Sequence, residues 1–231
     1  MKIIILFLLF TINLLSENNY FFESKIILRA KNKIENSVWE ISVFSTDSIL
    51  KYKISKELPF DVPPPGISLN EKNGDMILNY SLDGFAEVYK NSGLNNFKIQ
   101  HFEISKPNYE RIILSAFTDN EIILLFSSPE QEKAILKKYK INGILIWEKK
   151  LDFQFGYSLF ALQSNGLIAF SIYNSFVNKL EAKTIIYNSI GNEIYSDEIL
   201  AKKINFDLTI NAFIFATQNS IKKVELKDLG N

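Results

Sequence analysis

Residues 138–151 read KYKINGILIWEKKL, and this stretch carries the clearest pattern in the chain. Tyr139 stands four positions before Gly143, and Trp147 stands four positions after it. The apolar residues on both sides come in short runs that are rich in β-branched and aromatic side chains, which is typical of strands. The stretch therefore predicts a β-hairpin whose turn lies between two aromatic residues.

Asn142 and Gly143 predict the kind of turn. Tight two-residue hairpin turns need positive φ angles, and Asn-Gly adopts them at low cost. We therefore expect a two-residue turn between strands at 134–141 and 144–151.

The same pattern of aromatic, turn residue and aromatic occurs at three other places. The turn residues Ser48, Gly93, Gly143 and Gly191 are 45, 50 and 48 positions apart. The aromatic residues before and after each turn are Phe44 and Tyr52, Tyr89 and Phe97, Tyr139 and Trp147, and Tyr187 and Tyr195.

A second series of turns has the same period. Its Asn or Asp residues are Asn73, Asp119, Asn165 and Asn211, each 46 positions after the one before. Two series with different chemistry and one period indicate a structural repeat of about 46 residues.

One repeat contains four predicted strands. In the third repeat these are 112–118, 122–127, 134–141 and 144–151. Four antiparallel strands in about 46 residues are typical of one blade of a β-propeller. A single blade cannot bury both of its faces, so we expect the aromatic residues beside the turns to pack between blades.

The motif Tyr139, Gly143 and Trp147 resembles the repeats of WD40-like and quinoprotein-like (PQQ-like) β-propellers, whose blades carry Y-x-x-x-G-x-x-x-W. The resemblance covers roughly residue 37 to the end, and it is shared by proteins of many functions. Quinone-dependent members have eight blades and bind calcium, and none of their ligands can be assigned here. Envelope propellers that act as scaffolds in outer-membrane protein assembly are a nearer comparison, although those are often lipoproteins and this chain has no cysteine.

The predicted fold class is therefore all-β, a propeller of four-stranded antiparallel blades. The expected repeats are 20–58, 66–105, 110–151, 157–200 and 204–231, within a single domain at 17–231. The last repeat lacks its fourth strand, which we expect Tyr20 to Glu23 to supply as a separate strand that closes the ring. An open, partial propeller is the alternative.

The first sixteen residues, MKIIILFLLFTINLLS, predict a cleaved secretory signal. A lysine precedes an apolar run of about 13 residues, which is shorter than the roughly 20 that span a bilayer. We expect cleavage before Glu17 and an exported protein, periplasmic or extracellular, with no stable membrane span after processing. A retained anchor and a buried N-terminal strand are the alternatives.

The charge composition argues against a nucleic-acid or anionic-membrane partner. Lys and Arg total 26, Asp and Glu total 26, and only Arg29 and Arg111 are arginines. Counterion release needs a concentrated surplus of cations, which a balanced chain lacks. No cysteine is present, and His101 is the single histidine, so the usual thiolate and two-histidine metal sites are excluded.

No catalytic motif was found, and we expect no catalytic, cofactor-binding or metal-binding residue. Ser45 to Asp47 is a partial match to the Asp-box of sialidase propellers, which we interpret as an ordinary hairpin. The alternative is a small hydrolase of glycosidase type that uses carboxylates at the channel mouth. Its candidate acids lie near the starts of the predicted inner strands, and they are Asp61, Glu110, Asp152 and Asp207.

The favoured function is a non-enzymatic scaffold in the cell envelope that binds a protein or glycan partner. Aromatic and arginine side chains dominate protein-binding hot spots, and several lie in segments that we expect to be loops on one face. Plugging the central channel is the other role that such residues can have. The candidate binding residues are Pro64, Tyr109, Arg111, Phe153, Phe155, Tyr157, Tyr173, Phe176 and Phe206.

Overall fold

The structure is a computed structural model of the whole chain. It describes residues 5–7, 20–31, 33–59, 64–80, 85–91, 99–104, 111–118, 121–128, 133–151, 156–164, 166–174 and 181–229. The chain divides into two compact units, which are described separately below. The first comprises Met1–Tyr80 and Ala86–Glu103, and the second comprises Ser81–Phe85 and Ile104–Asn231.

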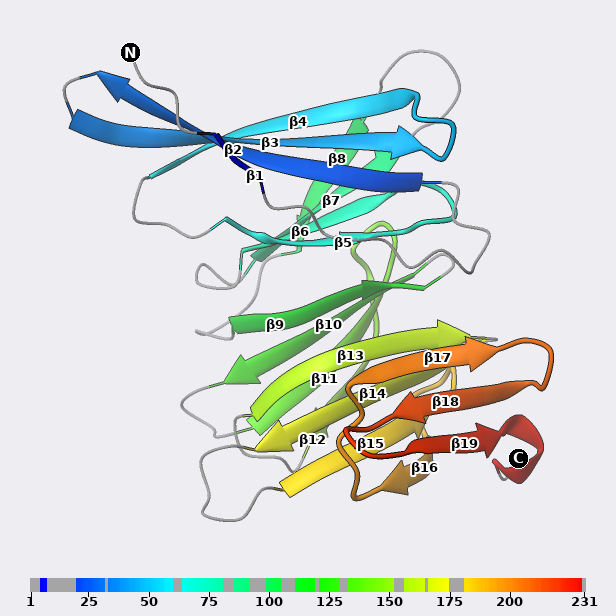
Figure 1. Cartoon of the computed structure of the whole chain (residues 1–231). Coiled ribbons are helices and arrows are strands. Elements are labelled where there is room, and N and C mark those ends of the chain that lie inside the picture. The colour runs from blue at the N-terminus through cyan, green and yellow to red at the C-terminus, as the bar shows by residue number, and fades with distance from the viewer. Residues whose placement is uncertain are drawn as a thin grey trace. The chain divides into compact units, whose positions relative to one another are not determined.

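The described strands form five antiparallel sheets, which we number 1 to 5 (Figure 1). Within each sheet, strands that are neighbours in sequence are also neighbours in space. Sheet 1 contains β1 (Ile5–Phe7), β2 (Tyr20–Lys31), β3 (Lys33–Ser45) and β4 (Leu50–Pro59). Sheet 2 contains β5 (Gly66–Leu69), β6 (Met76–Tyr80), β7 (Phe85–Asn91) and β8 (Ile99–Ile104).

The second unit holds the other three sheets. Sheet 3 contains β9 (Arg111–Phe117), β10 (Glu121–Ser128), β11 (Lys133–Lys140) and β12 (Leu145–Leu151). Sheet 4 contains β13 (Gly156–Ser164), β14 (Leu167–Asn174), β15 (Glu181–Tyr187) and β16 (Glu193–Asp197). Sheet 5 contains β17 (Lys203–Asp207), β18 (Ala212–Ala216) and β19 (Ile221–Glu225), which the short 3-10 helix η1 (Leu226–Asp228) follows.

The four strands predicted for the third repeat are confirmed by β9 to β12, with ends that differ by one residue. The central pair, β10 and β11, runs in unbroken register from Glu121 opposite Lys140 to Ser128 opposite Lys133. Its inner residues, such as Ile123 and Leu136, are buried. Runs of β-branched and aliphatic residues form these strands because such side chains pack well on a half-buried pleated surface.

The turn between β11 and β12 differs from the predicted two-residue turn. Lys140 N donates to Ile144 O (2.8 Å) and Gly143 N donates to Lys140 O (2.9 Å), so the loop has three residues. Gly143 has φ 85°, and the register shifts beside it at Lys138 and Tyr139. A three-residue loop that ends in a left-handed residue and a bulge keeps the twist of the two strands, which is why it replaces the shorter turn.

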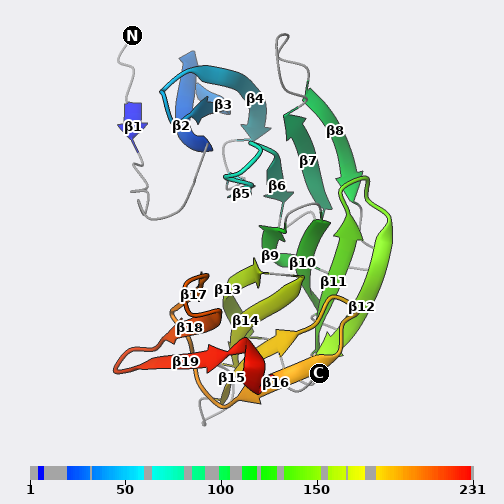
Figure 2. The ribbon, with the colours of Figure 1, turned by 90° about the vertical axis from the view of Figure 1, so that its right-hand side faces the viewer.

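The hydrophobic core lies between successive sheets of each unit. In the first unit Ile41 and Tyr52 of sheet 1 pack with Met76 and Tyr89 of sheet 2. In the second unit one cluster joins sheets 3 and 4 and another joins sheets 4 and 5. Figure 2 shows these three sheets following one another along the chain. The prediction that the aromatic residues beside the turns pack between sheets is confirmed for Tyr52, Tyr89 and Tyr187.

The prediction that Tyr20 to Glu23 forms a separate strand in the last blade is wrong. These residues begin β2, where Tyr20 lies opposite Ser45 and Glu23 opposite Ser42 of β3. The Phe21 ring stacks on Phe44 at 5.3 Å. Residues 20–23 and 25–29 belong to one long strand, because β3 is long enough to pair with both segments.

Sheet 5 consequently has three strands in the described part of the chain, in the order β17, β18 and β19. The residues after β19 form η1, and Leu229 returns to the core between sheets 4 and 5. Among the described residues, no helix has the length and apolar character that crossing a membrane requires.

Candidate functional site

The predicted binding residues are only partly described. Pro64 is exposed before β5, Arg111 begins β9, and Tyr157 and Tyr173 are opposite partners in β13 and β14. Three of these candidates thus lie in strands and not in the expected loops. The remaining candidates apart from Phe206, namely Tyr109, Phe153, Phe155 and Phe176, lie outside the described residues.

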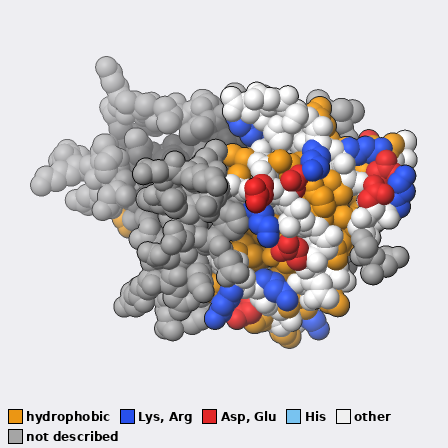
Figure 3. All heavy atoms as spheres, turned by 90° about the horizontal axis from the view of Figure 1, so that it is seen from below, with side chains coloured by type: hydrophobic (Ala, Val, Ile, Leu, Met, Phe, Trp, Pro, Cys, Tyr) orange, Lys and Arg blue, Asp and Glu red, His pale blue; other side chains and the backbone are white. Residues whose placement is uncertain are grey.

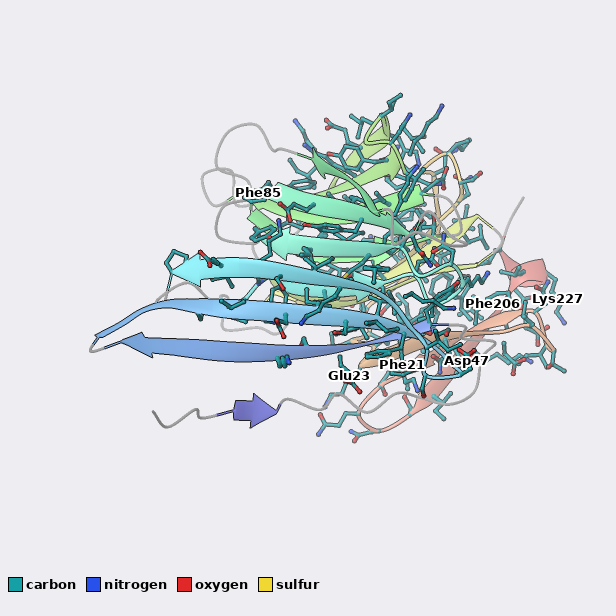
Figure 4. The ribbon with its side chains drawn as sticks, turned by 90° about the horizontal axis from the view of Figure 1, so that it is seen from above. Phe21, Glu23, Asp47, Phe85, Phe206 and Lys227 are labelled. Carbon is teal, nitrogen blue, oxygen red and sulfur yellow. The ribbon has the colours of Figure 1, made fainter. Side chains whose placement is uncertain are left out.

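The structure corrects the prediction that Phe206 lies in a loop of the binding surface. It lies in β17, which Figure 4 shows with its label, and not in a loop. Its ring meets Phe213 edge-on at 5.0 Å and packs against the core between sheets 4 and 5. Phe206 therefore contributes to packing, because alternation along β17 turns its side chain toward that core.

Of the candidate acids of the alternative hydrolase hypothesis, only Asp207 lies in the described part of the chain. Asp207 Oδ1 accepts hydrogen bonds from Thr209 N (2.8 Å) and Ile210 N (3.4 Å), so it caps the turn between β17 and β18. Asp61, Glu110 and Asp152 lie outside the described residues. His101 lies in β8. Within the described part, no group of three or more His, Cys, Asp or Glu side chains is placed to hold a metal ion.

The Asp-box-like segment forms the hairpin turn between β3 and β4, as predicted. Ser45 Oγ donates to Asp47 Oδ1, and this hydrogen bond lowers the pKa of the Asp47 carboxyl. Figure 4 labels Asp47 at this turn.

A buried carboxylate joins the two sheets of the first unit. Glu87 of β7 accepts hydrogen bonds from Tyr80 Oη (3.0 Å), Tyr89 Oη (2.7 Å) and Lys56 Nζ (2.9 Å). Burial raises the pKa of Glu87, but the hydrogen bonds from Lys56, Tyr89 and Tyr80 outweigh it, so the pKa lies below its usual value. All of these donors are internal, and Glu87 is therefore a structural link between β4 and sheet 2.

A tryptophan and a glycine fit together where sheets 3 and 4 meet. Trp147 Nε1 of β12 donates to Ser189 O (3.0 Å) in the turn between β15 and β16. A Cβ added to Gly191 in that turn would lie 3.1 Å from both Trp147 Cδ2 and Lys149 Cε. Strand β12 of sheet 3 is therefore in direct contact with the turn between β15 and β16 of sheet 4.

Large aliphatic side chains are exposed at these turns. Ile144 is 55% and Leu145 is 45% exposed after Gly143, and Ile190 is 70% exposed beside Gly191. On the face seen in Figure 3, hydrophobic side chains lie between groups of Lys or Arg and of Asp or Glu. Contiguous exposed apolar side chains on a folded surface mark interaction sites more often than isolated ones do.

The outer edge of β19 is the second exposed feature of the second unit. Thr217 N donates to Ser220 O (2.8 Å) and closes the hairpin, and the ladder then pairs Lys222 with Phe215 and Val224 with Phe213. Because hydrogen-bonded and non-hydrogen-bonded pairs alternate in an antiparallel ladder, the backbone groups of Ile221, Lys223 and Glu225 face away from β18.

The side-chain charges along β19 are already paired. Lys222 binds Asp197 of β16, while Lys223 Nζ and Lys227 Nζ each lie 2.7 Å from a Glu225 oxygen. The hydrogen bonds from Lys223 and Lys227 lower the pKa of Glu225 to about 2. What this edge offers a partner is therefore backbone donors and acceptors and the exposed Ile221.

The sequence reasoning missed both the exposed turns and this edge. The turn signal was available, because an Ile-Leu-Ile run follows Gly143 and Ile190 directly precedes Gly191. The edge had a signal as well, since the last repeat was seen to lack a strand, but that strand was assigned to the N-terminal segment.

Comparison with known proteins supports the fold class and identifies neither a family nor a function. No family model and no curated protein matches the sequence. A crystal structure of a functionally unknown protein from Desulfotomaculum acetoxidans is similar, with a TM-score of 0.52 and 16% identity. The alignment covers 83% of this chain and 60% of that one, so this chain spans less than two thirds of its length.

A second similar structure is the β-propeller domain of the Trilobed protease from Pyrococcus furiosus, which is described as having an open velcro topology. The TM-score is 0.50 at 7% identity, over 88% of this chain and 67% of that domain. Together with the antiparallel sheets, this likeness defines the class of protein: an all-β, propeller-like fold.

Proposed function

We propose that this chain is an exported, non-enzymatic, propeller-like scaffold of the cell envelope that binds a partner protein along the outer edge of β19. The unpaired edge of sheet 5 is the observation that carries the proposal. Within the described residues, the backbone groups of Ile221, Lys223 and Glu225 have no partner. An extended segment of another protein can add to such an edge as a further strand.

The chemistry of the edge favours a different protein over a second copy. In the fully overlapped antiparallel register, Lys223 of one copy would face Lys223 of the other. Like charges directly opposite each other destabilise a sheet, and exposed lysines are a common protection against pairing of identical edges. The similar β-propeller domain from Pyrococcus furiosus is described as having an open velcro topology, which supports a sheet edge left without a strand partner.

The export part of the proposal rests on residues 1–16, and the scaffold part is also supported by the resemblance of the repeats to WD40-like and PQQ-like propellers. The predicted binding residues Pro64 and Arg111 lie in the described part and stay candidates, with Tyr157 and Tyr173.

The test replaces Lys223 by proline. Proline removes an outward N–H and leaves the bonds to β18 in place, and edge strands tolerate it. We expect Lys223→Pro to lose a partner captured from envelope extract, while Lys223→Ala retains it and both melt near the wild-type temperature. Capture that survives in Lys223→Pro, with an unchanged melt, would exclude strand addition at this edge.

A further inference from the structure

One edge of β2 is covered only in part by another described strand. Its other edge pairs with β3 along the whole length of β2, whereas β1 pairs only with Lys25, Ile26 and Ile27. Figure 4 labels Phe21 and Glu23, which lie on β2 before the residues that β1 covers. Among the described strands, this edge therefore has a covered segment and an open one before it.

The hydrogen bonds at the start of β2 show which backbone groups point away from β3. Ser45 N of β3 donates on the β4 side, and Tyr20 N of β2 donates to Glu71 O (3.1 Å). Tyr20 and Ser45 lie opposite each other and are therefore a pair without mutual hydrogen bonds. Because the direction of these groups alternates along a strand, every second residue after Tyr20 also faces outward. The outward backbone groups are those of Phe22, Ser24 and Ile26.

Two copies of this edge match in an antiparallel register centred on Ser24. Ser24 of one copy then lies opposite Ser24 of the other, and Phe22 lies opposite Ile26. Glu23 lies opposite Lys25 on both sides of the centre, in pairs without mutual hydrogen bonds, where side chains are closest. Opposite charges that face each other in this way stabilise a sheet. Sliding one copy by two residues would place Glu23 opposite Glu23 or Lys25 opposite Lys25, so the charges select one register.

Both charged side chains are accessible to a second copy. Glu23 is exposed and, within the described residues, forms no ion pair. The Lys25 side chain is 46% exposed and shares the Glu40 carboxylate with Lys53, at N–O distances of 2.9 and 2.8 Å. Two lysines on one carboxylate leave a positive charge that Glu23 of a second copy can balance.

From this complementarity we infer that two copies of the chain form a two-fold dimer through their β2 edges once β1 has left. β1 pairs with Lys25–Ile27, which the second copy needs, and a covered edge is protected from pairing. Release of β1 rests on the proposed export, because it follows from removal of residues 1–16. The β19 edge differs, since a second copy there would place Lys223 opposite Lys223.

The test measures self-association by sedimentation equilibrium. Exported protein, with its first residue identified by N-terminal sequencing, is compared with the full chain at the same concentrations. We expect a concentration-dependent dimer from exported protein that lacks residues 1–16 and a monomer from the full chain. Leu6→Pro in the full chain should also dimerise, because proline removes the N–H that faces Ile26. This variant tests pairing of the β2 edges independently of export and cleavage.

Charge reversal tests the register. Glu23→Lys carries lysine at positions 23 and 25, and Lys25→Glu carries glutamate at both, so each variant should dimerise about tenfold more weakly. An equimolar mixture of the two variants should recover the wild-type affinity, because each lysine then faces a glutamate. Lys51→Glu, on β4, is the matched control and should dimerise as the wild type does.

Substitution of Ser24 tests the backbone pairing. Ser24→Pro removes an outward N–H at the centre of the register and leaves the bonds to β3 in place. We expect it to remain monomeric at concentrations where Ser24→Ala dimerises, with similar melting temperatures for the two variants.

Three outcomes would overturn the inference. The first is a monomer both for exported protein that lacks residues 1–16 and for Leu6→Pro. The second is a mixture of the charge variants that associates no more strongly than its components, although both melt as the wild type does. The third is loss of the dimer in Lys223→Pro and not in Ser24→Pro, which would place the contact at β19. Partner capture that depends on Lys223 bears on the proposed function alone, because the dimer uses an edge of the first unit.

Discussion

Ser48, Gly143 and Gly191 occupy the same left-handed position in three hairpin turns, with φ angles of 63°, 85° and 85°. In each turn the N–H of this residue donates to the carbonyl three positions earlier. A left-handed φ strains any residue with a Cβ, so the serine carries a cost that the two glycines avoid.

Ser48→Gly should therefore raise the free energy of unfolding. The relief of roughly 1–2 kcal/mol exceeds the extra chain entropy of glycine, about 0.5–1 kcal/mol, so we expect a gain of up to about 1 kcal/mol. Urea unfolding of the two proteins measures it. Unchanged or reduced stability would show that Ser45 and Asp47 already relieve the strain through side-chain hydrogen bonds.

Gly191→Ala should have the opposite effect and a larger one. Its Cβ would need a left-handed φ and would also crowd Trp147 and Lys149. We expect a loss of about 2–3 kcal/mol in the same urea experiment. A loss below about 0.5 kcal/mol would mean that the Trp147 side chain shifts at little cost to make room for the added methyl group.

Glu87 predicts a pH dependence for the first unit. Its pKa is lowered in the folded chain, so its stabilisation is fully present above the unfolded value of about 4.3 and is lost as the pH falls through the lower folded value. Glu87→Gln should cost about 1–3 kcal/mol at pH 7, and the difference from wild type should shrink toward pH 3. A difference that stays constant with pH would contradict the role of the charge.

Trp147 of sheet 3 contacts the turn between β15 and β16 of sheet 4. Its ring lies 6.3 Å from Tyr187, and its indole N–H bonds to Ser189 O. A contact of this kind joins two sheets that are each unable to bury both faces alone, and stability of the second unit depends on it.

Substitution separates the two parts of this contact. Trp147→Ala should lower the free energy of unfolding by about 3 kcal/mol through lost packing, whereas Trp147→Phe should lose about 1 kcal/mol with the hydrogen bond. Ile221→Ala, at an exposed side chain, is the control and should stay within about 0.5 kcal/mol. Equal melting temperatures for all three would place Trp147 outside the packing between sheets.

We expect the N-terminal residues to be removed when the protein is exported. Ile5–Phe7 pairs with Ile27 to Lys25 of β2, a contact of three residue pairs, whereas β2 pairs with β3 along its whole length. Removal of 1–16 should therefore leave sheet 1 folded. We expect exported protein to begin near Glu17 by N-terminal sequencing, and exported material that begins at Met1 would contradict a cleaved signal.

The sequence alone was enough to predict the strands and the contacts that repeat along the chain. The 46-residue period located β9 to β12 within one residue, and the aromatic positions beside the turns marked buried contacts such as Tyr52 and Tyr187. These features are local, because the side-chain alternation of a strand and the φ requirement of a turn depend on residues that are close in the chain.

Only the tertiary structure decided which long-range partner each segment has. Tyr20 to Glu23 has the composition of a strand that suits either sheet 1 or sheet 5, and its pairing with β3 depends on the length of β3. Phe206 changed from a surface candidate to a packing residue because its face of β17 meets Phe213. The contact of Trp147 with the turn at Gly191 likewise joins two sheets, and such adjacency belongs to the packed arrangement and not to any one stretch of sequence.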